Sequence, residues 1–200
     1  MQIENLILNT GVCNLNSVIN ALNYLGIKSK VSKINEDIDY YKNIIIPGVG
    51  TFDTAIKNLR EYAFFSKLKD ESFFNDRNLI GICVGMQVLF QKSEEGILPG
   101  LSLLSGDVKK FDEKFLKVPH MGWNKVYGKK FYKNLESKKF YFAHSFYVQC
   151  PEEYIIGYAN YPSPFPVFIK KNNIYGIQFH PEKSSQNGIK FLKNIFNTLI

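Results

Sequence analysis

The chain has 200 residues, of which 45% are hydrophobic and 22% are charged. This length and composition favour one domain with a sizeable core, and we predict a single domain over residues 1–200. The amino-terminal apolar run is too short for a secretory signal, and no apolar run approaches the roughly 18 residues of a membrane-spanning helix. The sequence therefore predicts a protein without a membrane partner.

The formal net charge is +7, but only two of the 25 basic residues, Arg60 and Arg77, are arginines. Proteins that recognise nucleic-acid bases depend on the paired donors of arginine. We therefore expect solvated lysines and no nucleic-acid partner. A basic surface that meets a phosphorylated substrate or an acidic subunit remains open.

The three cysteines, Cys13, Cys83 and Cys150, are widely spaced and odd in number. This spacing suits neither a disulfide framework nor a zinc site. We expect a reducing, cytoplasmic location, no metal and no cofactor.

Strands and helices are expected to alternate over residues 1–90. Apolar runs predict strands within 3–9, 27–32, 43–47 and 78–82, and helical spacing predicts helices within 17–25 and 51–69. Such alternation is typical of a parallel sheet covered by helices on both faces.

Beyond residue 90, short apolar runs follow one another with few helical segments between them. We expect antiparallel strands within 101–108, 140–150, 152–159, 165–170 and 174–179, and a closing helix over 186–199. The predicted fold class is α/β, an open and mostly parallel sheet flanked by helices, with added antiparallel strands.

The stretch LIGICVGMQVLF, residues 79–90, places Cys83 where a strand becomes a helix. A residue on such a sharp turn is exposed above the sheet, and small neighbours such as Gly81 and Gly85 let the backbones approach. The following helix directs its free N–H groups at the sulfur, which favours the thiolate. The amide of Val84 then lies where a donor to an oxyanion is needed.

A thiolate nucleophile requires a base, and the candidates are His120, His144 and His180. Only His180 has a carboxylate nearby, Glu182. Pro181 keeps His180 extended, and residues two apart in an extended segment face the same side, so Glu182 can orient the imidazole. A buried core cysteine or a surface histidine would explain either residue alone, whereas the two together favour a nucleophile with its base.

A second oxyanion donor is expected from the run IIIPGVG, where Val49 lies between Gly48 and Gly50. Two glycines allow the peptide to turn its N–H toward the sulfur. By itself, a plain turn that ends a strand explains this run equally well.

The motifs GICVGMQ and QFHPEKS resemble those of the class I, triad-type glutamine amidotransferases, which have a flavodoxin-like fold. The order and spacing of PGVG, PHMGWN and YFAHSFYV are similar to one subfamily, HisH, the glutaminase subunit of imidazole glycerol phosphate synthase. The resemblance covers essentially the whole chain.

The resemblance implies that Cys83 attacks the side-chain amide of L-glutamine, that His180 moves the proton and that Glu182 orients His180. The amides of Val49 and Val84 would hold the oxyanion. Positions that match the family's glutamine-binding residues are Gly48, Gly50, Gln87, Glu95, His144, Ser145 and Phe146.

The resemblance also implies a heterodimer with a HisF-type cyclase, a (β/α)₈ barrel that receives ammonia through a tunnel. The cyclase would make imidazole glycerol phosphate and the purine precursor AICAR in histidine biosynthesis. A partner-facing loop is expected around PHMGWN, and the interface residues would be Asn14, His120, Met121, Trp123 and Asn124.

Two segments depart from the subfamily pattern: the first loop, LNTGVCNLNSV, and the run PSPFPVFIK. Both bear on the partner surface. A HisH-like ammonia donor to a HisF-like partner that amidates a surface sugar is therefore an alternative. A stand-alone cysteine hydrolase of the dienelactone-hydrolase type lacks a late H-P-E and PHMGWN, and a binding module with a decayed site is disfavoured because the whole predicted triad is present.

Overall fold

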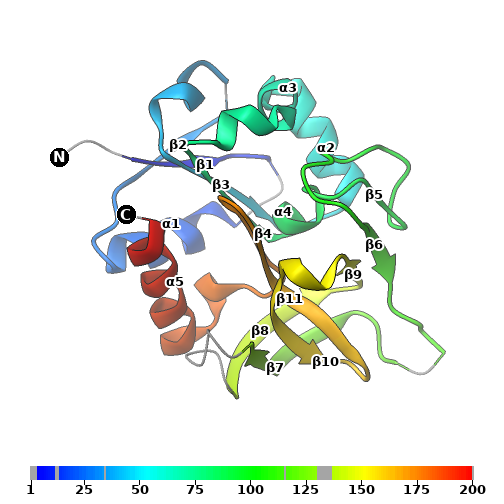
Figure 1. Cartoon of the computed structure of the whole chain (residues 1–200). Coiled ribbons are helices and arrows are strands. Elements are labelled where there is room, and N and C mark those ends of the chain that lie inside the picture. Colours follow the sequence, from blue (N-terminus) through cyan, green and yellow to red (C-terminus); the bar gives the residue numbers. More distant parts are fainter. Residues whose placement is uncertain (1–3, 12–13, 34, 115, 130–136, 200) are drawn as a thin grey trace.

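In the computed structural model, which describes residues 4–11, 14–33, 35–114, 116–129 and 137–199, nine strands form one mixed sheet (Figure 1). The strand order is β2-β1-β3-β4-β12-β11-β10-β7-β8. The predicted α/β class is confirmed.

The first half of this sheet is parallel throughout. Most of its residues are buried, as expected for strands covered on both faces. It consists of β2 (Ser29–Ser32), β1 (Asn5–Leu8), β3 (Asn43–Gly48), β4 (Asn78–Cys83) and β12 (Ile174–Ile177).

The helices cover both faces of the parallel half (Figure 1). On one side lie α1 (Leu15–Tyr24) and α5 (Ser185–Leu199). On the other side lie α2 (Phe52–Glu61), α3 (Phe64–Lys69) and α4 (Val84–Gln87). Short 3₁₀ helices occupy Asn35–Tyr40 (η1), Glu71–Phe74 (η2), Glu152–Tyr154 (η4) and Pro181–Lys183 (η5).

The second half of the sheet is antiparallel. It consists of β11 (Pro164–Lys171), β10 (Ile155–Asn160), β7 (His120–Gly128) and β8 (Lys138–His144). Among the described residues a separate three-stranded sheet contains β5 (Lys92–Ser93), β6 (Asp107–Lys110) and β9 (Phe146–Gln149).

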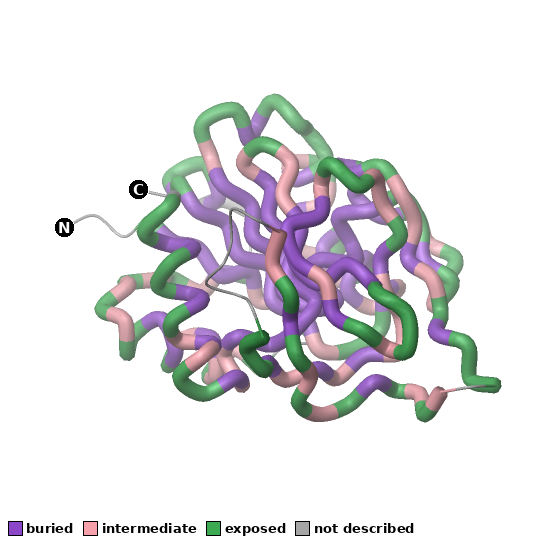
Figure 2. The backbone as a smooth tube through the Cα atoms, turned by 60° about the horizontal axis from the view of Figure 1, so that its bottom comes forward, coloured by how far each residue is buried: buried purple, intermediate pink, exposed green. Residues whose placement is uncertain are grey.

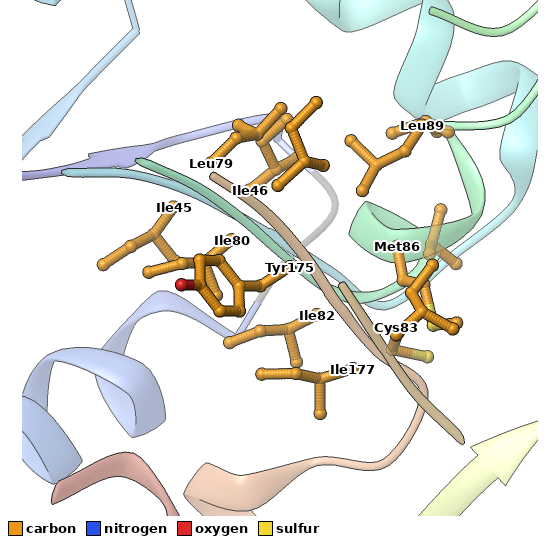
Figure 3. Close-up of a cluster of buried hydrophobic side chains, with 14 of the residues drawn as sticks. Ile45, Ile46, Leu79, Ile80, Ile82, Cys83, Met86, Leu89, Tyr175 and Ile177 are labelled. Carbon is orange, nitrogen blue, oxygen red and sulfur yellow. The ribbon is translucent and has the colours of Figure 1, made fainter. Parts of the chain in front are cut away.

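Buried residues make up most of the central strands (Figure 2). Successive residues of a strand point to opposite faces, so Ile45 and Ile46 lie on different sides of β3 (Figure 3). Cys83 lies beside Met86 at the carboxyl end of β4 (Figure 3).

A buried ladder of asparagines aligns the amino ends of three parallel strands. Asn43 Nδ2 donates to Asn5 Oδ1 over 2.9 Å, and Asn78 Nδ2 donates to Asn43 Oδ1 over 2.7 Å. Because a buried amide without a partner is costly, these bonds disfavour a slip in register. They help to set which residues meet at the opposite edge.

Three sequence predictions differ from the structure. Within 101–108 only Asp107–Val108 belong to a strand, because the loop at Leu101–Leu104 folds back on Val88, Leu89 and Phe90 through backbone hydrogen bonds. The run 140–150 is broken at Ser145 into β8 and β9, which belong to different sheets. The segment expected to be a partner-facing loop is the strand β7, which pairs with β8.

Candidate active site

Cys83 occupies a strained turn between β4 and α4. Its backbone angles are φ 56° and ψ −114°, a region that residues other than glycine rarely adopt, and the residue is 2% exposed. Strain of this kind is concentrated at functional sites, where the surrounding structure maintains it. The backbone therefore makes the sharp turn that the sequence predicts at Cys83.

The glycines on either side of Cys83 are required by packing. A Cβ atom added at Gly85 would lie 1.8 Å from the carbonyl oxygen of Ile46. One added at Gly81 would lie 2.3 Å from the carbonyl oxygen of Gly85. Backbone meets backbone at both positions, so no side chain fits.

His180 and Glu182 form a buried pair directly after β12. Nδ1 of His180 lies 2.8 Å from Oε1 of Glu182, and the side chains are 1% and 3% exposed. His180 is extended, with φ −98° and ψ 94°, as expected before proline. Pro181, however, begins the 3₁₀ turn η5, so Glu182 reaches back to His180 from a turn and not along an extended segment.

The protonation of His180 depends on its two neighbours. Burial lowers the pKa of the imidazole, but the interactions with Cys83 and with Glu182 outweigh it and raise the pKa to about 10. Within the described part of the chain, Nε2 of His180 and Oε2 of Glu182 have no hydrogen-bond partner. Nε2 is therefore free to exchange a proton with Cys83 and a substrate.

The two candidate oxyanion residues lie at the same edge of the sheet. Gly48 at the end of β3 is the register partner of Cys83, so Val49 and Val84 are the residues that follow a matched pair. A Cβ atom at Gly48 would lie 2.9 Å from the amide nitrogen of Gly85, and Gly50 has φ 153°. The loop requires glycine at both positions.

Gln87 is buried on α4 and bonded through its amide nitrogen. Nε2 lies 3.0 Å from the carbonyl oxygen of Phe146 and 3.2 Å from Oε1 of Gln178. Because Gln178 Oε1 is the acceptor here, its Nε2 is a donor, and it lies 3.9 Å from Sγ of Cys83.

Gln178, which lies between Gln87 and Cys83, is not predicted from the sequence motifs. This residue is fully buried and is the only polar residue in the apolar run 174–179. A buried amide in such a run needs partners, which was the available signal. The partners themselves come from residues distant in the sequence.

The segment from His144 to Phe146 contacts Gln87 through the carbonyl oxygen of Phe146. Nδ1 of His144 lies 2.7 Å from the carbonyl oxygen of Phe146, and the carbonyl of Ser145 accepts from the amide of Phe111. Burial lowers the pKa of His144 to about 3. His144 is therefore a neutral, structural partner of the backbone.

Glu95 contacts the first residue of α2. Its Oε2 accepts a hydrogen bond of 2.7 Å from the amide of Phe52, the first residue of α2. Burial raises the pKa of the Glu95 carboxyl, opposed by this hydrogen bond. In the opposite direction, the carboxylate of Asp53 on α2 accepts hydrogen bonds from the amides of Ile97 and Leu98, which follow Glu95.

The predicted interface residues fall into two groups. Met121 and Trp123 are 65% and 51% exposed on one face of β7, and Asn14 is exposed at the start of α1, where its side chain accepts from the amide of Ser17. His120 is buried on the other face of β7, and Asn124 bonds to it. Direct contact of His120 with a partner is therefore incompatible with this structure, because alternate residues of a strand face opposite sides.

The sequence matches a known family along almost its whole length. The model of the family described as "Glutamine amidotransferase class-I" matches residues 6–199. The chain belongs to the class I glutamine amidotransferases. Membership confirms the resemblance drawn from the sequence motifs.

Curated members of this glutamine amidotransferase family are similar over most of the chain. The imidazole glycerol phosphate synthase subunit HisH 1 of Campylobacter jejuni (strain RM1221) is 40% identical over 187 residues, which cover 90% of this chain and 93% of that protein. The subunit HisH of Carboxydothermus hydrogenoformans is 41% identical, with 91% and 93% covered. The subunit HisH of Leptospira interrogans is 39% identical, with 94% and 97% covered.

Solved structures share the fold of this glutamine amidotransferase at low sequence identity. A structure described as a glutamine amidotransferase has a TM-score of 0.76 at 20% identity, with 97% of each chain covered. The structure of PurLQS from Thermotoga maritima has a TM-score of 0.71 at 16% identity, with 100% of each chain covered. These values support the architecture described above.

Two other features are absent from the described residues. No group of three or more His, Cys, Asp or Glu side chains there is arranged to hold a metal ion. No helix in the same part of the chain is long and apolar enough to cross a bilayer.

Proposed function

We propose that this chain, as one domain over residues 1–200, is the glutaminase subunit of imidazole glycerol phosphate synthase. It hydrolyses L-glutamine to glutamate and ammonia. The observation that carries the proposal is the meeting of Cys83 on its strained turn with the buried pair His180 and Glu182. The 40% identity to curated HisH subunits supports the same activity.

In the first half of the reaction, Sγ of Cys83 attacks the side-chain amide carbon of glutamine. The thiol proton has already passed to Nε2 of His180 before the attack, because the raised pKa of the imidazole favours the pair of thiolate and imidazolium. Amides of Val49 and Val84 stabilise the negative charge that develops on the amide oxygen. When the C–N bond breaks, His180 returns the proton to the leaving nitrogen, and ammonia departs from a thioester.

In the second half, His180 accepts a proton from water, whose oxygen attacks the thioester carbon. The C–S bond breaks, the sulfur regains a proton from His180, and glutamate is released. Glu182 keeps Nδ1 of His180 protonated through the 2.8 Å contact, which leaves Nε2 as the atom that moves protons.

The α-amino and carboxylate groups of glutamine bind around Gln87, Glu95 and the segment 144–146. Gln87 directs its amide nitrogen at Phe146 and Gln178. Its remaining polar atom is an acceptor oxygen, which suits an ammonium group. Glu95 supplies a carboxylate whose negative charge is opposite to that of the ammonium group.

The partner is a HisF-type cyclase that receives the ammonia directly from this subunit. The complex is cytoplasmic. Exposed Met121 and Trp123 on β7 offer apolar area for this contact, as aromatic and methionine side chains do at many interfaces. The released ammonia joins phosphoribulosyl-formimino aminoimidazole carboxamide ribonucleotide, which gives imidazole glycerol phosphate and AICAR.

The test is reconstitution with the HisF-type cyclase encoded by the same organism. We expect glutamine-dependent formation of imidazole glycerol phosphate and AICAR in equal amounts. One glutamate should be released for each pair of products. Glutamate release without these products, together with amidation of a sugar when a different HisF-like partner is supplied, would replace the histidine pathway by the surface-sugar alternative.

A further inference from the structure

A chain of hydrogen bonds links two buried histidines outside the triad to the glutamine site. His120 on β7 and His144 on β8 are register partners, and Nδ1 of His120 lies 3.0 Å from Nε2 of His144. Nδ1 of His144 lies 2.7 Å from the carbonyl oxygen of Phe146. The same oxygen accepts from Nε2 of Gln87 over 3.0 Å.

The donor and the acceptor of each hydrogen bond in this series can be assigned from the Phe146 carbonyl at its end. A carbonyl oxygen only accepts, so Nδ1 of His144 carries the proton and Nε2 is an acceptor in the neutral ring. Nδ1 of His120 must therefore be the donor to His144, and its Nε2 accepts from Nδ2 of Asn124 over 3.1 Å. Only one pair of tautomers satisfies all three contacts.

The surroundings keep both rings neutral and in place. His120 stacks on Tyr161 with ring centres 4.1 Å apart, and His144 lies among Phe111, Phe142 and Phe165. Burial lowers the pKa of His120 to about 4. Burial, together with the nearby rings of His120 and His180, lowers the pKa of His144 to about 3.

We propose that His120 is a positioning residue for glutamine binding, which acts through His144 to hold the Phe146 carbonyl that orients Gln87. The proposal rests on the proposed function, because Gln87 is assigned there to the amino-acid part of glutamine. His120 touches neither the substrate nor Cys83. Loss of its Nδ1 donor leaves Nε2 of His144 buried without a partner, and the Phe146 carbonyl loses its fixed position.

The experiment compares two alkylators of Cys83. Diazo-oxo-norleucine carries the amino-acid groups of glutamine, whereas iodoacetamide lacks them. His120→Phe keeps an aromatic ring in the stack but removes both nitrogens. We expect it to raise the concentration of diazo-oxo-norleucine that gives half-maximal labelling by about tenfold, the order expected for one unsatisfied buried group. The rate with iodoacetamide should stay as in the wild type.

A conservative pair keeps the test independent of how well His120→Phe folds. His120→Asn retains a donor near the Nδ1 position, whereas His120→Gln retains only a polar atom near the Nε2 position. We expect tight diazo-oxo-norleucine binding in His120→Asn and weak binding in His120→Gln. Tyr161→Phe removes a hydroxyl from the same cluster but not from the chain of bonds, and should behave as the wild type.

The double variant His120→Phe/His144→Phe tests whether the two histidines act in series. If they act in series, the double variant binds diazo-oxo-norleucine no more weakly than the worse single variant. The first substitution already interrupts the series of hydrogen bonds, so the second removes nothing further. Additive losses, an unchanged His120→Phe, or equal slowing with both reagents would overturn the inference. Absence of saturable labelling in the wild type would instead overturn the proposed function, and this inference with it.

Discussion

Gly48 and Cys83 are register partners on the neighbouring parallel strands β3 and β4. The residue that follows the end of each strand, Val49 or Val84, is a candidate donor to the oxyanion. One donor lies on a helix start and the other in a loop between two glycines. The two donors therefore differ in mobility, because glycines at 48 and 50 lower the barrier to rotating the Val49 peptide.

We predict that the isolated chain has weak basal glutaminase activity, and that binding of the cyclase with its ribonucleotide favours a state in which the Val49 peptide turns its N–H toward the oxyanion. Val49→Pro should therefore lower the partner-stimulated activity far more than the basal activity. Proline lacks the N–H group, so the turned peptide has no donor. The loss expected for one oxyanion donor is about 10²- to 10³-fold. Val49→Ala keeps the N–H and is the matched control. Equal losses of basal and stimulated turnover, measured as glutamate release with and without the cyclase and its ribonucleotide, would contradict a switch at Val49.

We predict that Cys83→Ala abolishes glutamine-dependent synthesis by the complex but leaves synthesis from ammonium salts intact. Only amide cleavage needs the thiolate, whereas ammonia is used by the partner. Product formation with each nitrogen source measures this directly. A complex that is inactive with ammonium as well would show that Cys83 has another role.

Diazo-oxo-norleucine should label Cys83 and spare Cys150. Burial and the nearby Glu152 and Glu153 raise the pKa of Cys150 to about 12, so its thiol stays protonated. Peptide mapping by mass spectrometry identifies the labelled residue. Cys13, which lies outside the described residues, is expected to remain unlabelled, and Cys150→Ser is the control.

We predict that His180→Asn is nearly as damaging as loss of Cys83, while Glu182→Gln is milder. His180 moves a proton in every step, but an amide at 182 still accepts from Nδ1. The double variant Cys83→Ala/His180→Asn should be only slightly worse than either single variant, because the two residues act as one unit. Losses in kcat that multiply would argue against that unit.

The raised pKa of His180 predicts a loss of stability at alkaline pH. The unfolded value is near 6.5 and the folded value about 10. The stabilisation from the charged ring is therefore complete below the unfolded value and is lost as the pH rises through about 10. Urea unfolding at about pH 7 and about pH 10.5 should show a smaller difference between wild type and His180→Asn at the higher pH. An unchanged difference would place the folded pKa of His180 near its ordinary value.

We predict that Trp123→Ala weakens assembly with the cyclase and leaves the labelling of Cys83 by diazo-oxo-norleucine unchanged. Half of the Trp123 side chain is exposed on β7, where it lies edge-on to Tyr141 with ring centres 6.2 Å apart. Truncation of a central interface tryptophan typically costs about 2 kcal/mol or more. Binding is measured by titration calorimetry. Tyr40→Ala, which removes a still more exposed aromatic residue before β3, is the control and should bind as the wild type.

The parallel half of the fold, the turn at Cys83 and the contact between His180 and Glu182 were predictable because their signals are local. Strands β1, β3 and β4 read as unbroken apolar runs, and Gly81 and Gly85 mark the elbow at Cys83. The relation of His180 to Glu182 spans two residues, so proline and spacing suffice to predict it. The predicted extended backbone is found at His180 but not at Glu182, which lies in the 3₁₀ turn η5.

The rest of the site depends on pairing between distant segments. Gln178 and Cys83 are 95 residues apart and meet only because β12 lies beside β4. The contact between His120 and His144 likewise requires β7 to pair with β8. The proline and glycine in PHMGWN weaken the strand signal, so β7 resembled a loop and its buried face was not foreseen.

Within the described chain, the strand that joins the two halves of the large sheet, β12, is the last to leave the ribosome. Until it inserts between β4 and β11, both strands have an open edge of unpaired peptide groups. His180 and Glu182 follow directly behind β12, so the nucleophile and its base come together only when that gap closes. A nascent chain or a product of early termination therefore carries Cys83 without its base and cannot deplete glutamine. The unpaired edge of β4 in such a chain is prone to aggregation and is a site that chaperones and proteases would recognise.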